Sequence, residues 1–398
     1  MYKANISKSS NYDTILECIY RNPGISRKDI SDLTGITPAT VTTTVSAMFS
    51  DGIVEELGRM EEDRGTVGRA RIALGIVPGY GYTIGAEFNL SALAVCAADL
   101  GGNLLYFKSL PYSDAQGNQI TKNLIEEIQC CLNAVSRTDS RLMGIGIGLP
   151  GHIDDKGQYL ISTSENWKDF DAFKIQSAFD CPVVFENNIR CVALSEYLYN
   201  PLNTPSSFAL FHIGQGMFCA NITEDELYIG TSYTSGEIGH TIAVPDGRKC
   251  LCGKRGCLET VANEGAIVED CRQIYRQDPN SLLRNYAATP EELTIENVSD
   301  AYSLGDASVR RLITQALRYL CIATLNIAVL MNPEKLLLHG RLFNHPDIQT
   351  DLLEMIQKEF SFTGNSYRLG SVDFLPCRET DGALGGAALA VWKCLIHE

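Results

Sequence analysis

The sequence has no long apolar run and no excess of positive charge. Its amino terminus, MYKANISKSSNYDTILECIY, lacks the apolar core of a signal peptide, and no stretch reaches the roughly 20 apolar residues of a membrane span. Lys and Arg number 33 against 48 Asp and Glu, giving a net charge of −15. This balance excludes a protein that coats nucleic acid by bulk attraction. The missing targeting segment predicts a cytoplasmic location.

Disulfide bonds are not expected either, although the chain has 14 cysteines. A large chain without an export signal keeps its thiols reduced. Cys96, Cys191 and Cys321 lie inside apolar runs, which predicts core positions for them. With 398 residues, of which 45% are apolar and 20% charged, the chain is long enough for two or three hydrophobic cores and too apolar for a disordered protein.

The acidic residues are unevenly distributed. Residues 1–81 contain nine Lys or Arg and ten Asp or Glu, so nearly all of the net negative charge lies in the remainder. A local DNA-binding module at the amino terminus is therefore compatible with an acidic chain.

The run ISRKDISDLTGITPATVTTTVSAMFSDGIVEEL carries two helix starts in close succession. Ser26 stands three residues before Asp29, which is the spacing of a capping box. Thr37 precedes Pro38, a residue favoured at the first position of a helix. Between the two helices, Gly35 predicts a tight turn.

Helical spacing predicts which sides of these two helices face inward. On the first helix this side is formed by Ile30 and Leu33. The outer side of the second helix carries threonines, whose small hydroxyl side chains can approach phosphates and base edges in a major groove. Its inward side is formed by Val41, Val45 and Met48.

Two short alternating runs, GIVEEL and RARIALG, follow and predict a β-hairpin or wing around an arginine-containing loop. The alternative is a helical oligomerisation domain with a solvated charged loop. The joint pattern favours a winged helix-turn-helix over residues 1–75 and resembles the amino-terminal reader of bacterial repressors. The candidate DNA contacts are Ser26, Thr37, Thr40, Thr42, Thr43, Thr44, Arg69 and Arg71.

From Tyr82 onward, short β-branched or apolar runs alternate with helix-length stretches. This alternation is typical of an α/β architecture. Two strand–turn–strand units of similar character, near Gly85 and Gly214, indicate an internal duplication.

The glycine-rich run GEIGHTIAVPDGRKCLCGKRGCLE, residues 236–259, contains four candidate metal ligands: His240, Cys250, Cys252 and Cys257. One imidazole and three thiolates make up the tetrahedral set of a structural zinc ion, and this filled shell leaves no position for an activated water. The alternative is four unliganded side chains in a loop.

The segments IGLPGHID, FENNIRCVALSEY, GEIGH and CLCGKRGCLE have the order and spacing of the ROK family, which the chain resembles from about residue 82. The resemblance implies a two-lobed, actin-like or hexokinase-like ATPase fold over residues 76–398, zinc on the four ligands, and a sugar bound between the lobes. For Glu259, at a helix start, helix-dipole capping is the alternative. The sugar ligands that the resemblance implies are Asn166, Asn187, Asn188, Glu237, His240 and Glu259.

The chain departs from the ROK kinases at the positions that carry catalysis. The Asn-Asp pair with the general base reads Asn187-Asn188, and an amide cannot take a proton from a sugar hydroxyl at neutral pH. The phosphate loop reads EFNLS, with Glu87 for the aspartate and Asn89-Leu90 for the glycine pair. The runs HIGQGMFCA and LLLHGRLFN also lack expected glycines. These changes predict no ATP binding and no enzyme activity.

Together these features predict a sugar-responsive transcriptional repressor of carbohydrate-utilisation genes. Two half-sites of an operator require two recognition helices, so a homodimer or a dimer of dimers is expected. The alternatives are a ROK sugar kinase, and a regulator controlled by zinc, by a partner protein or by a phosphorylated sugar.

Overall fold

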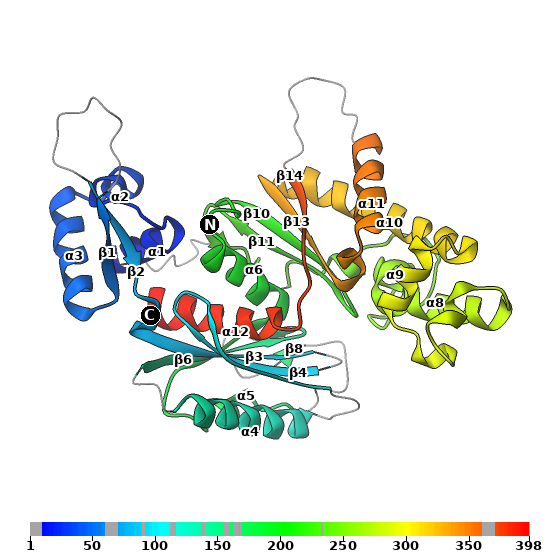
Figure 1. Cartoon of the computed structure of the whole chain (residues 1–398), viewed down its shortest axis with the longest axis horizontal. Coiled ribbons are helices and arrows are strands. Elements are labelled where there is room, and N and C mark those ends of the chain that lie inside the picture. Colours follow the sequence, from blue (N-terminus) through cyan, green and yellow to red (C-terminus); the bar gives the residue numbers. More distant parts are fainter. Residues whose placement is uncertain are drawn as a thin grey trace. The chain divides into compact units, whose positions relative to one another are not determined.

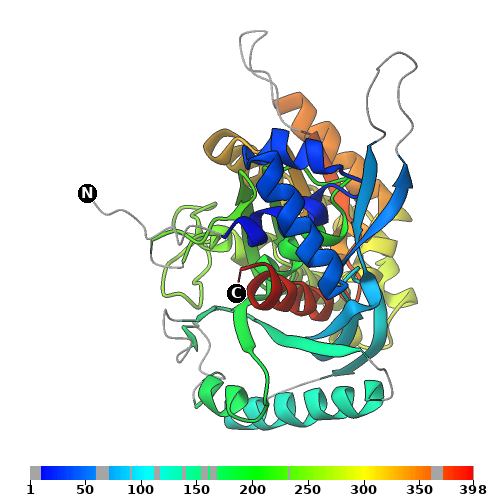
Figure 2. The same ribbon diagram turned by 90° about the vertical axis from the view of Figure 1, so that its left-hand side faces the viewer.

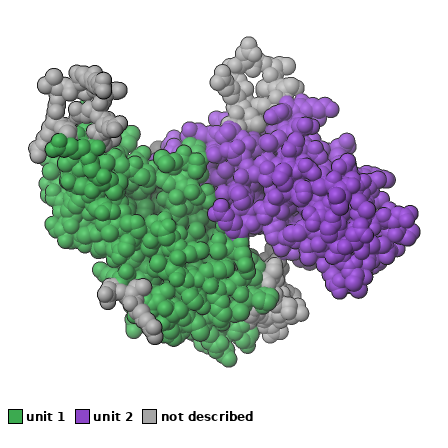
Figure 3. Space-filling view, in the orientation of Figure 1, with its two compact units in different colours: residues 1–205, 379–398 green, residues 206–378 purple. Residues whose placement is uncertain are grey.

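A computed structural model of the chain describes residues 10–59, 71–89, 92–111, 117–136, 140–153, 160–161, 167, 169–231, 234–359 and 371–397. They form two compact units, coloured separately in Figure 3. Unit 1 comprises residues 1–205 and 379–398, and unit 2 comprises residues 206–378. The predicted DNA-reading segment belongs to unit 1, and the predicted metal ligands belong to unit 2.

The amino-terminal domain is a winged helix-turn-helix, as predicted (Figures 1 and 2). Ser26 and Asp29 form the capping box of the second helix, and Thr37 caps the third. Gly35 ends the second helix with a φ of 70°, a left-handed conformation that glycine adopts without strain. The elements are α1 (Asn11–Arg21), α2 (Arg27–Thr34), α3 (Pro38–Asp51) and the antiparallel strands β1 (Val54–Arg59) and β2 (Ile72–Ile76).

The core of this domain confirms four of the five predicted inward side chains. Ile30, Val41, Val45 and Met48 are all fully buried. The prediction for Leu33 is wrong, because its side chain is 67% exposed. Helix α2 is only eight residues long and ends one residue after Leu33, so no further turn covers this side chain.

Helix α1 is fixed to helix α6 (Asn188–Tyr199) by polar contacts at its carboxyl end. Arg21 donates to the backbone oxygens of Tyr197 (2.6 Å) and Thr204 (2.8 Å), and its guanidinium lies 4.1 Å from the centre of the Tyr197 ring. The Tyr197 hydroxyl donates in turn to Glu17 Oε1 at 2.6 Å. The DNA-reading domain and α6 therefore share a specific polar junction, here called the α1–α6 junction.

Arg21→Ala is expected to loosen this junction. The substitution removes two charge-assisted hydrogen bonds and leaves the carbonyls of Tyr197 and Thr204 without that donor, at a cost of about 2 kcal/mol. Hydrogen exchange measured by mass spectrometry should become faster in α1. Arg311→Ala, which truncates an exposed arginine of unit 2, is the control. Equal protection of α1 in both variants would contradict the role given to Arg21.

The first α/β half is a five-stranded sheet with helices on both faces (Figure 1). Its strand order is β5-β4-β3-β6-β9, with α4 on one face and α12 on the other. The close approach of α12 depends on Gly85, where a Cβ would lie 1.9 Å from the Ala383 carbonyl oxygen. The bounds are η1 (Pro78–Tyr80), β3 (Gly81–Phe88), β4 (Ala92–Asp99), β5 (Leu104–Pro111), α4 (Gly117–Val135), β6 (Arg141–Leu149), β7 (His152–Ile153), β8 (Leu160–Ile161), α5 (Ala172–Gln176), β9 (Val183–Asn187), α12 (Asp381–Val391) and η7 (Trp392–Ile396).

Unit 2 contains a second five-stranded sheet, in the order β12-β11-β10-β13-β14, whose helices enclose one large apolar core. The bounds are β10 (Phe208–Ile213), β11 (Met217–Thr223), β12 (Glu226–Leu227), η3 (Ile238–His240), α7 (Glu259–Ala262), α8 (Glu264–Gln277), η4 (Leu282–Asn285), η5 (Pro290–Glu292), α9 (Ile295–Ser303), α10 (Ala307–Met331), β13 (Lys335–His339), η6 (Arg341–Asn344), α11 (Pro346–Glu359) and β14 (Ser371–Leu375).

The two sheets have the same topology, which agrees with the predicted duplication. In the first sheet, β3 pairs antiparallel with β4 and parallel with β6, and β6 pairs parallel with β9. In the second sheet, β10 pairs antiparallel with β11 and parallel with β13, and β13 pairs parallel with β14. The antiparallel units β3–β4 and β10–β11 are the ones that the sequence placed near Gly85 and Gly214. The α/β architecture predicted from Tyr82 onward is therefore two copies of one sheet pattern.

Helix α10 is the one described helix that is long and apolar enough to cross a membrane by length and composition alone. Half of its most apolar stretch is buried inside unit 2. Ten of its residues, among them Ile313, Leu317 and Leu320, are buried, so the helix forms a wall of the unit 2 core.

Candidate metal and sugar site

The described cysteines are thiols that are not joined by disulfide bonds, as the sequence predicted. Cys96, Cys191 and Cys321 are at most 2% exposed. All 14 cysteines lie among the described residues, and none of them forms a disulfide bond there. Three of the others gather in the segment 236–259 of unit 2.

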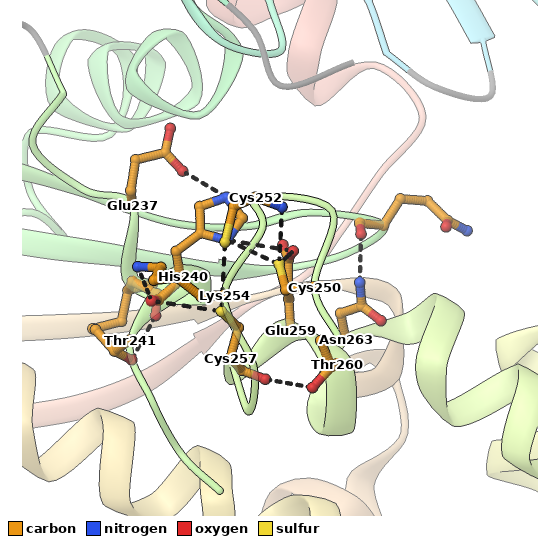
Figure 4. A network of polar contacts seen from close by, with 12 residues as sticks. Glu237, His240, Thr241, Cys250, Cys252, Lys254, Cys257, Glu259, Thr260 and Asn263 are labelled. Carbon is orange, nitrogen blue, oxygen red and sulfur yellow. Dashed lines mark hydrogen bonds and ion pairs between the residues drawn. The ribbon is translucent and has the colours of Figure 1, made fainter. Parts of the chain in front are cut away.

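This segment brings the four predicted metal ligands together (Figure 4). His240 closes the short helix η3, and an isolated bridge between Ile242 and Cys257 folds the chain back beside it. The nitrogen and sulfur atoms of His240, Cys250, Cys252 and Cys257 all lie within 4.8 Å of one another. Backbone turns, rather than regular elements, therefore position this cluster.

The spacing of the cluster fits a tetrahedral zinc ion. Cys252 Sγ lies 3.6 Å from Cys257 Sγ, and Cys250 Sγ lies 3.6 Å from His240 Nδ1. A tetrahedral ion with Zn–S bonds of about 2.3 Å and a Zn–N bond of about 2.0 Å separates such atoms by roughly 3.5–3.8 Å. Three thiolates and one imidazole also match the ligand preference of zinc.

The protonation of the thiols differs within the cluster. Burial, and next the Glu259 carboxylate at 2.8 Å, raise the pKa of the Cys250 thiol. Burial acts in the same direction on Cys252, but the backbone N–H of Lys254 and the neighbouring thiols outweigh it and leave the pKa of Cys252 below its ordinary value. A metal ion would therefore displace the proton of Cys252 more easily than the proton of Cys250.

Two carboxylates face the cluster from opposite sides of the imidazole, as Figure 4 shows. Glu237 Oε2 lies 3.8 Å from His240 Nε2, and Glu259 Oε1 lies 3.3 Å from His240 Nδ1. Glu259 is the first residue of the four-residue helix α7, and its carboxylate contacts the cluster. The structure thus brings together the three predicted sugar ligands of unit 2: Glu237, His240 and Glu259.

The predicted sugar ligands of unit 1 have different surroundings. Asn187 is 3% exposed, accepts hydrogen bonds from the first turn of α6 and donates to the Gly151 carbonyl at 3.2 Å. These contacts make Asn187 the cap of α6, so its direct contact with a sugar stays a prediction. Asn188 begins α6 and is half-buried. Asn166 lies outside the described residues.

Sequence reasoning missed a contact between two of the changed kinase positions. Asn188 Nδ2 donates to Glu87 Oε1 at 2.9 Å, and Asn89 Nδ2 donates to Glu87 Oε2 at 3.2 Å. Glu87 thus connects the run that resembles the kinase phosphate loop to Asn188, the position that the resemblance gives to the base. Leu90 lies outside the described residues. Glutamate is one methylene longer than the aspartate of the kinases. This extra length is the one sequence signal that the side chain of Glu87 could reach Asn188.

The nucleotide-side segments of unit 2 are closed by internal contacts. His212 Nδ1 and His339 Nδ1 lie 3.0 Å apart on paired strands, and burial, then His339, hold the pKa of His212 well below its ordinary value. Arg341 donates twice to Glu264 Oε2, at 2.8 and 3.2 Å, beside Gly340. The side chains of Met217, Phe218 and Cys219 are buried. These groups lie in the runs where the resemblance to the ROK kinases implies phosphate-binding glycines.

The DNA-reading face is only partly as predicted. Thr37, Thr42 and Thr43 are exposed, and Thr40 and Thr44 are half-buried. Ser26 has another role: its side chain is buried, and its hydroxyl lies 2.7 Å from Asp29 Oδ2 within the cap of α2, so the prediction of a DNA contact is corrected. Arg71 forms an ion pair with Asp29 at 2.9 Å. Arg69, like Arg64 in the same loop, lies outside the described residues.

A cavity of about 220 Å³ in unit 2 shares only Glu237 with the predicted sugar ligands. Its wall includes three apolar side chains of α10, Ile327, Leu330 and Met331. Its wall also includes the polar side chains of Asn221, Tyr228, Ser235 and Thr241. The cavity therefore adjoins the candidate sugar site through Glu237.

Comparison with known families and proteins agrees with this division of the chain. A model described as "ROK family" matches residues 83–392, and one described as "Winged helix-turn-helix DNA-binding" matches residues 14–55. The xylose repressor of Bacillus spizizenii is 27% identical over 366 residues, which cover 91% of this chain and 90% of the repressor. A glucokinase of Halalkalibacterium halodurans is also 27% identical, over 281 residues covering 70% of this chain and 84% of the kinase.

A solved structure with the same fold extends over the whole chain. The crystal structure of a ROK family transcriptional regulator, a homologue of the E. coli MLC protein, matches with a TM-score of 0.73. The match covers 97% of both chains at 23% identity. The amino-terminal reader and the two sheets therefore occur together in a known architecture, as the sequence predicted.

Proposed function

The chain belongs to the ROK family, whose model matches residues 83–392, and from this membership we propose that it is a sugar-responsive, DNA-binding repressor of carbohydrate-utilisation genes. The winged helix-turn-helix is the DNA reader, and we keep its boundary near residue 75, at the end of β2. The effector is a monosaccharide or a derivative held by the carboxylates and the imidazole of the 236–259 segment.

One observation carries this proposal: the sugar-side groups are assembled while the catalytic groups are replaced. Glu237 and Glu259 flank His240, and carboxylates suit vicinal hydroxyls because each can accept several hydrogen bonds. Asn188 occupies the position of the general base and is bonded to Glu87. A scaffold that retains its ligand site without a base is suited to sensing.

The protein is proposed not to be an enzyme, although a glucokinase is among its relatives. A phosphoryl transfer needs a base at the sugar hydroxyl and N–H donors for the phosphates. Asn188 cannot be that base, and the Arg341–Glu264 pair occupies the nucleotide side. Purified protein with Mg-ATP and a sugar panel should form no sugar phosphate, whereas turnover at about 1 s⁻¹ or faster, an ordinary kinase rate, would refute this proposal.

The residues that would hold zinc are His240, Cys250, Cys252 and Cys257, with His240 bound through Nδ1, the nitrogen nearest Cys250. When bound, the ion supplies a rigid crosslink and no catalytic chemistry, because all four positions are taken by protein. His240 Nε2 then faces Glu237 and remains able to donate a hydrogen bond to a sugar hydroxyl.

The partners that follow from this function are a double-stranded operator and a second copy of the chain. A pseudo-palindromic operator requires two recognition helices related by a two-fold axis, so we propose a homodimer or a dimer of dimers in the cytoplasm. Light scattering at micromolar concentration should give at least twice the chain mass of 43.6 kDa. A stable monomer that binds the operator with full affinity would contradict the dimer.

Glu237→Gln is expected to weaken sugar binding by about 10- to 100-fold, because a charge-assisted hydrogen bond contributes roughly 1.5–3 kcal/mol. The measurement is the thermal shift of the full chain with a panel of free sugars and sugar phosphates, followed by release from operator DNA. Glu226→Gln, an exposed glutamate of β12, is the matched control. If no compound shifts the melting temperature and Glu237→Gln changes nothing, this site is not a sugar site.

A further inference from the structure

The cavity that adjoins the candidate sugar site lies entirely within unit 2 and has two kinds of wall. One wall is the segment that carries predicted sugar ligands, since residues 235–238, with Glu237 among them, line the cavity. Another wall is the end of α10, which contributes Ile327, Leu330 and Met331. A ligand bound at Glu237 therefore has an apolar surface of the same unit beside it.

The size of the cavity suits a part of a ligand and not a whole one. Pockets that enclose a drug-sized ligand usually measure about 300–1,000 Å³. This cavity measures about 220 Å³. An apolar cavity of about 150 Å³ is large enough for a benzene ring. The cavity therefore has room for one ring-sized substituent of a sugar that is itself bound outside it.

Three polar side chains of the wall direct hydrogens at the protein. Asn221 Nδ2 donates to Thr223 Oγ1 at 2.7 Å, and Ser235 Oγ donates to the Tyr228 carbonyl at 3.2 Å. The Thr241 hydroxyl donates to a backbone carbonyl of η3 at 2.7 Å. Each of these hydroxyls has only one hydrogen to donate. A substituent without polar groups suits such a wall, because a polar group placed there would exchange water for fewer hydrogen bonds.

The rim of the cavity exposes large apolar and aromatic side chains. Tyr228 is 51% exposed, Leu330 is 81% exposed and Met331 is 38% exposed. Exposed apolar side chains that gather around a hollow are typical of a binding surface. An apolar ligand group seated among these three side chains would remove their surface from water, which favours binding.

The segment between the sugar ligands and the cavity is fixed by strand β11. The backbone N–H of Cys219 donates to the Gly236 carbonyl at 2.8 Å. Gly236 has a φ of 104°, and a Cβ on it would lie 2.5 Å from the Phe218 ring. This close approach holds Glu237 at a set distance from the cavity. One rigid ligand can therefore contact both without a cost for ordering the segment.

We propose that the effector is a glycoside with an apolar aglycone about the size of one aromatic ring. Glu237 and His240 bind the sugar, and the cavity binds the aglycone. The inference rests on the proposed function and deepens it, since it names the chemical class of the effector.

The test compares phenyl and methyl glycosides of D-glucose and D-xylose, each in both anomeric forms, by calorimetric titration into the full chain. One phenyl glycoside is expected to bind at least about tenfold more tightly than the methyl glycoside of the same sugar and anomer. Leu330→Asp places a charge on the wall and should reduce this ratio to within about threefold. Leu304→Asp, which changes a leucine with 66% exposure at the end of α9, is the matched control and should keep the ratio.

The outcomes separate this inference from the proposed function. A ratio near one for every pair overturns the aglycone site and leaves a sugar-responsive regulator intact. A high ratio that Leu330→Asp leaves unchanged overturns the assignment to this cavity, and if that variant is also monomeric in light scattering, a second copy covers the wall instead. Should Leu330→Asp fail to fold, Met331→Gln, a polar side chain of similar size, replaces it. No binding of any glycoside or of either free sugar, together with no effect of Glu237→Gln, overturns both proposals.

Discussion

Cys257→Ser is expected to abolish zinc binding and to weaken sugar binding by about 100-fold or more. A serine hydroxyl stays protonated at neutral pH and cannot replace a thiolate in the shell. The segment that carries the ligands has little core of its own, since Ile242 is 50% exposed and Leu251 is 93% exposed. Without the ion, the loop that carries His240 between Glu237 and Glu259 would lose its four-ligand crosslink.

The measurements are the metal content of the purified protein and the sugar-dependent thermal shift. The unmodified chain should contain about one zinc per chain, and the variant should contain almost none. Cys130→Ser changes an exposed cysteine of α4 and should keep both the zinc and the shift. Full sugar binding by a zinc-free variant would show that the metal does not position this site.

Thr43→Glu is expected to weaken operator binding by about 100-fold or more. Thr43 is exposed on α3, and its hydroxyl donates to the Ala39 carbonyl at 3.0 Å, so its methyl group and oxygen face outward. A carboxylate placed there would meet the phosphates and acceptor-rich base edges of a major groove. Sugar binding should stay unchanged, because α3 lies in the separate amino-terminal domain.

Thr350→Glu is the matched control for this variant. Thr350 is an exposed threonine of α11 with the same bond to the carbonyl four residues earlier, to Pro346 at 3.0 Å. Electrophoretic mobility shifts over a salt series should show a steep salt dependence for the control and the unmodified chain. Equal operator affinity of Thr43→Glu and Thr350→Glu would show that α3 is not part of the DNA interface.

Signals from residues that are close in the sequence were sufficient to predict the elements of the DNA reader and the grouping of the metal ligands. Caps such as Ser26 and Thr37 act within one helical turn, so the residues that place a helix start are adjacent in the chain. The four metal ligands lie within 18 residues, and turn geometry alone brings them together. Leu33 shows the limit of this approach, because burial depends on which helix covers a side chain.

The contacts that distinguish this protein from a kinase could not be predicted in the same way. Glu87 and Asn188 are 101 residues apart, and their hydrogen bond follows from the positions of β3 and β9 on either side of β6. The His212–His339 pair, 127 residues apart, depends on the register of β10 and β13. Sequence spacing does not encode strand register over such separations.

Helix α6 connects a predicted sugar ligand with the DNA-reading domain. It begins with Asn188, and near its end Tyr197 holds Arg21, about 14 Å further along at 1.5 Å per residue. If a sugar shifts this helix, the two bindings belong to one thermodynamic cycle. The operator must then change the dissociation constant of the sugar by the same factor as the sugar changes that of the operator. In a cell in which every operator is occupied, the repressor molecules bound to operators and those free of DNA would therefore differ in their sensitivity to the same sugar.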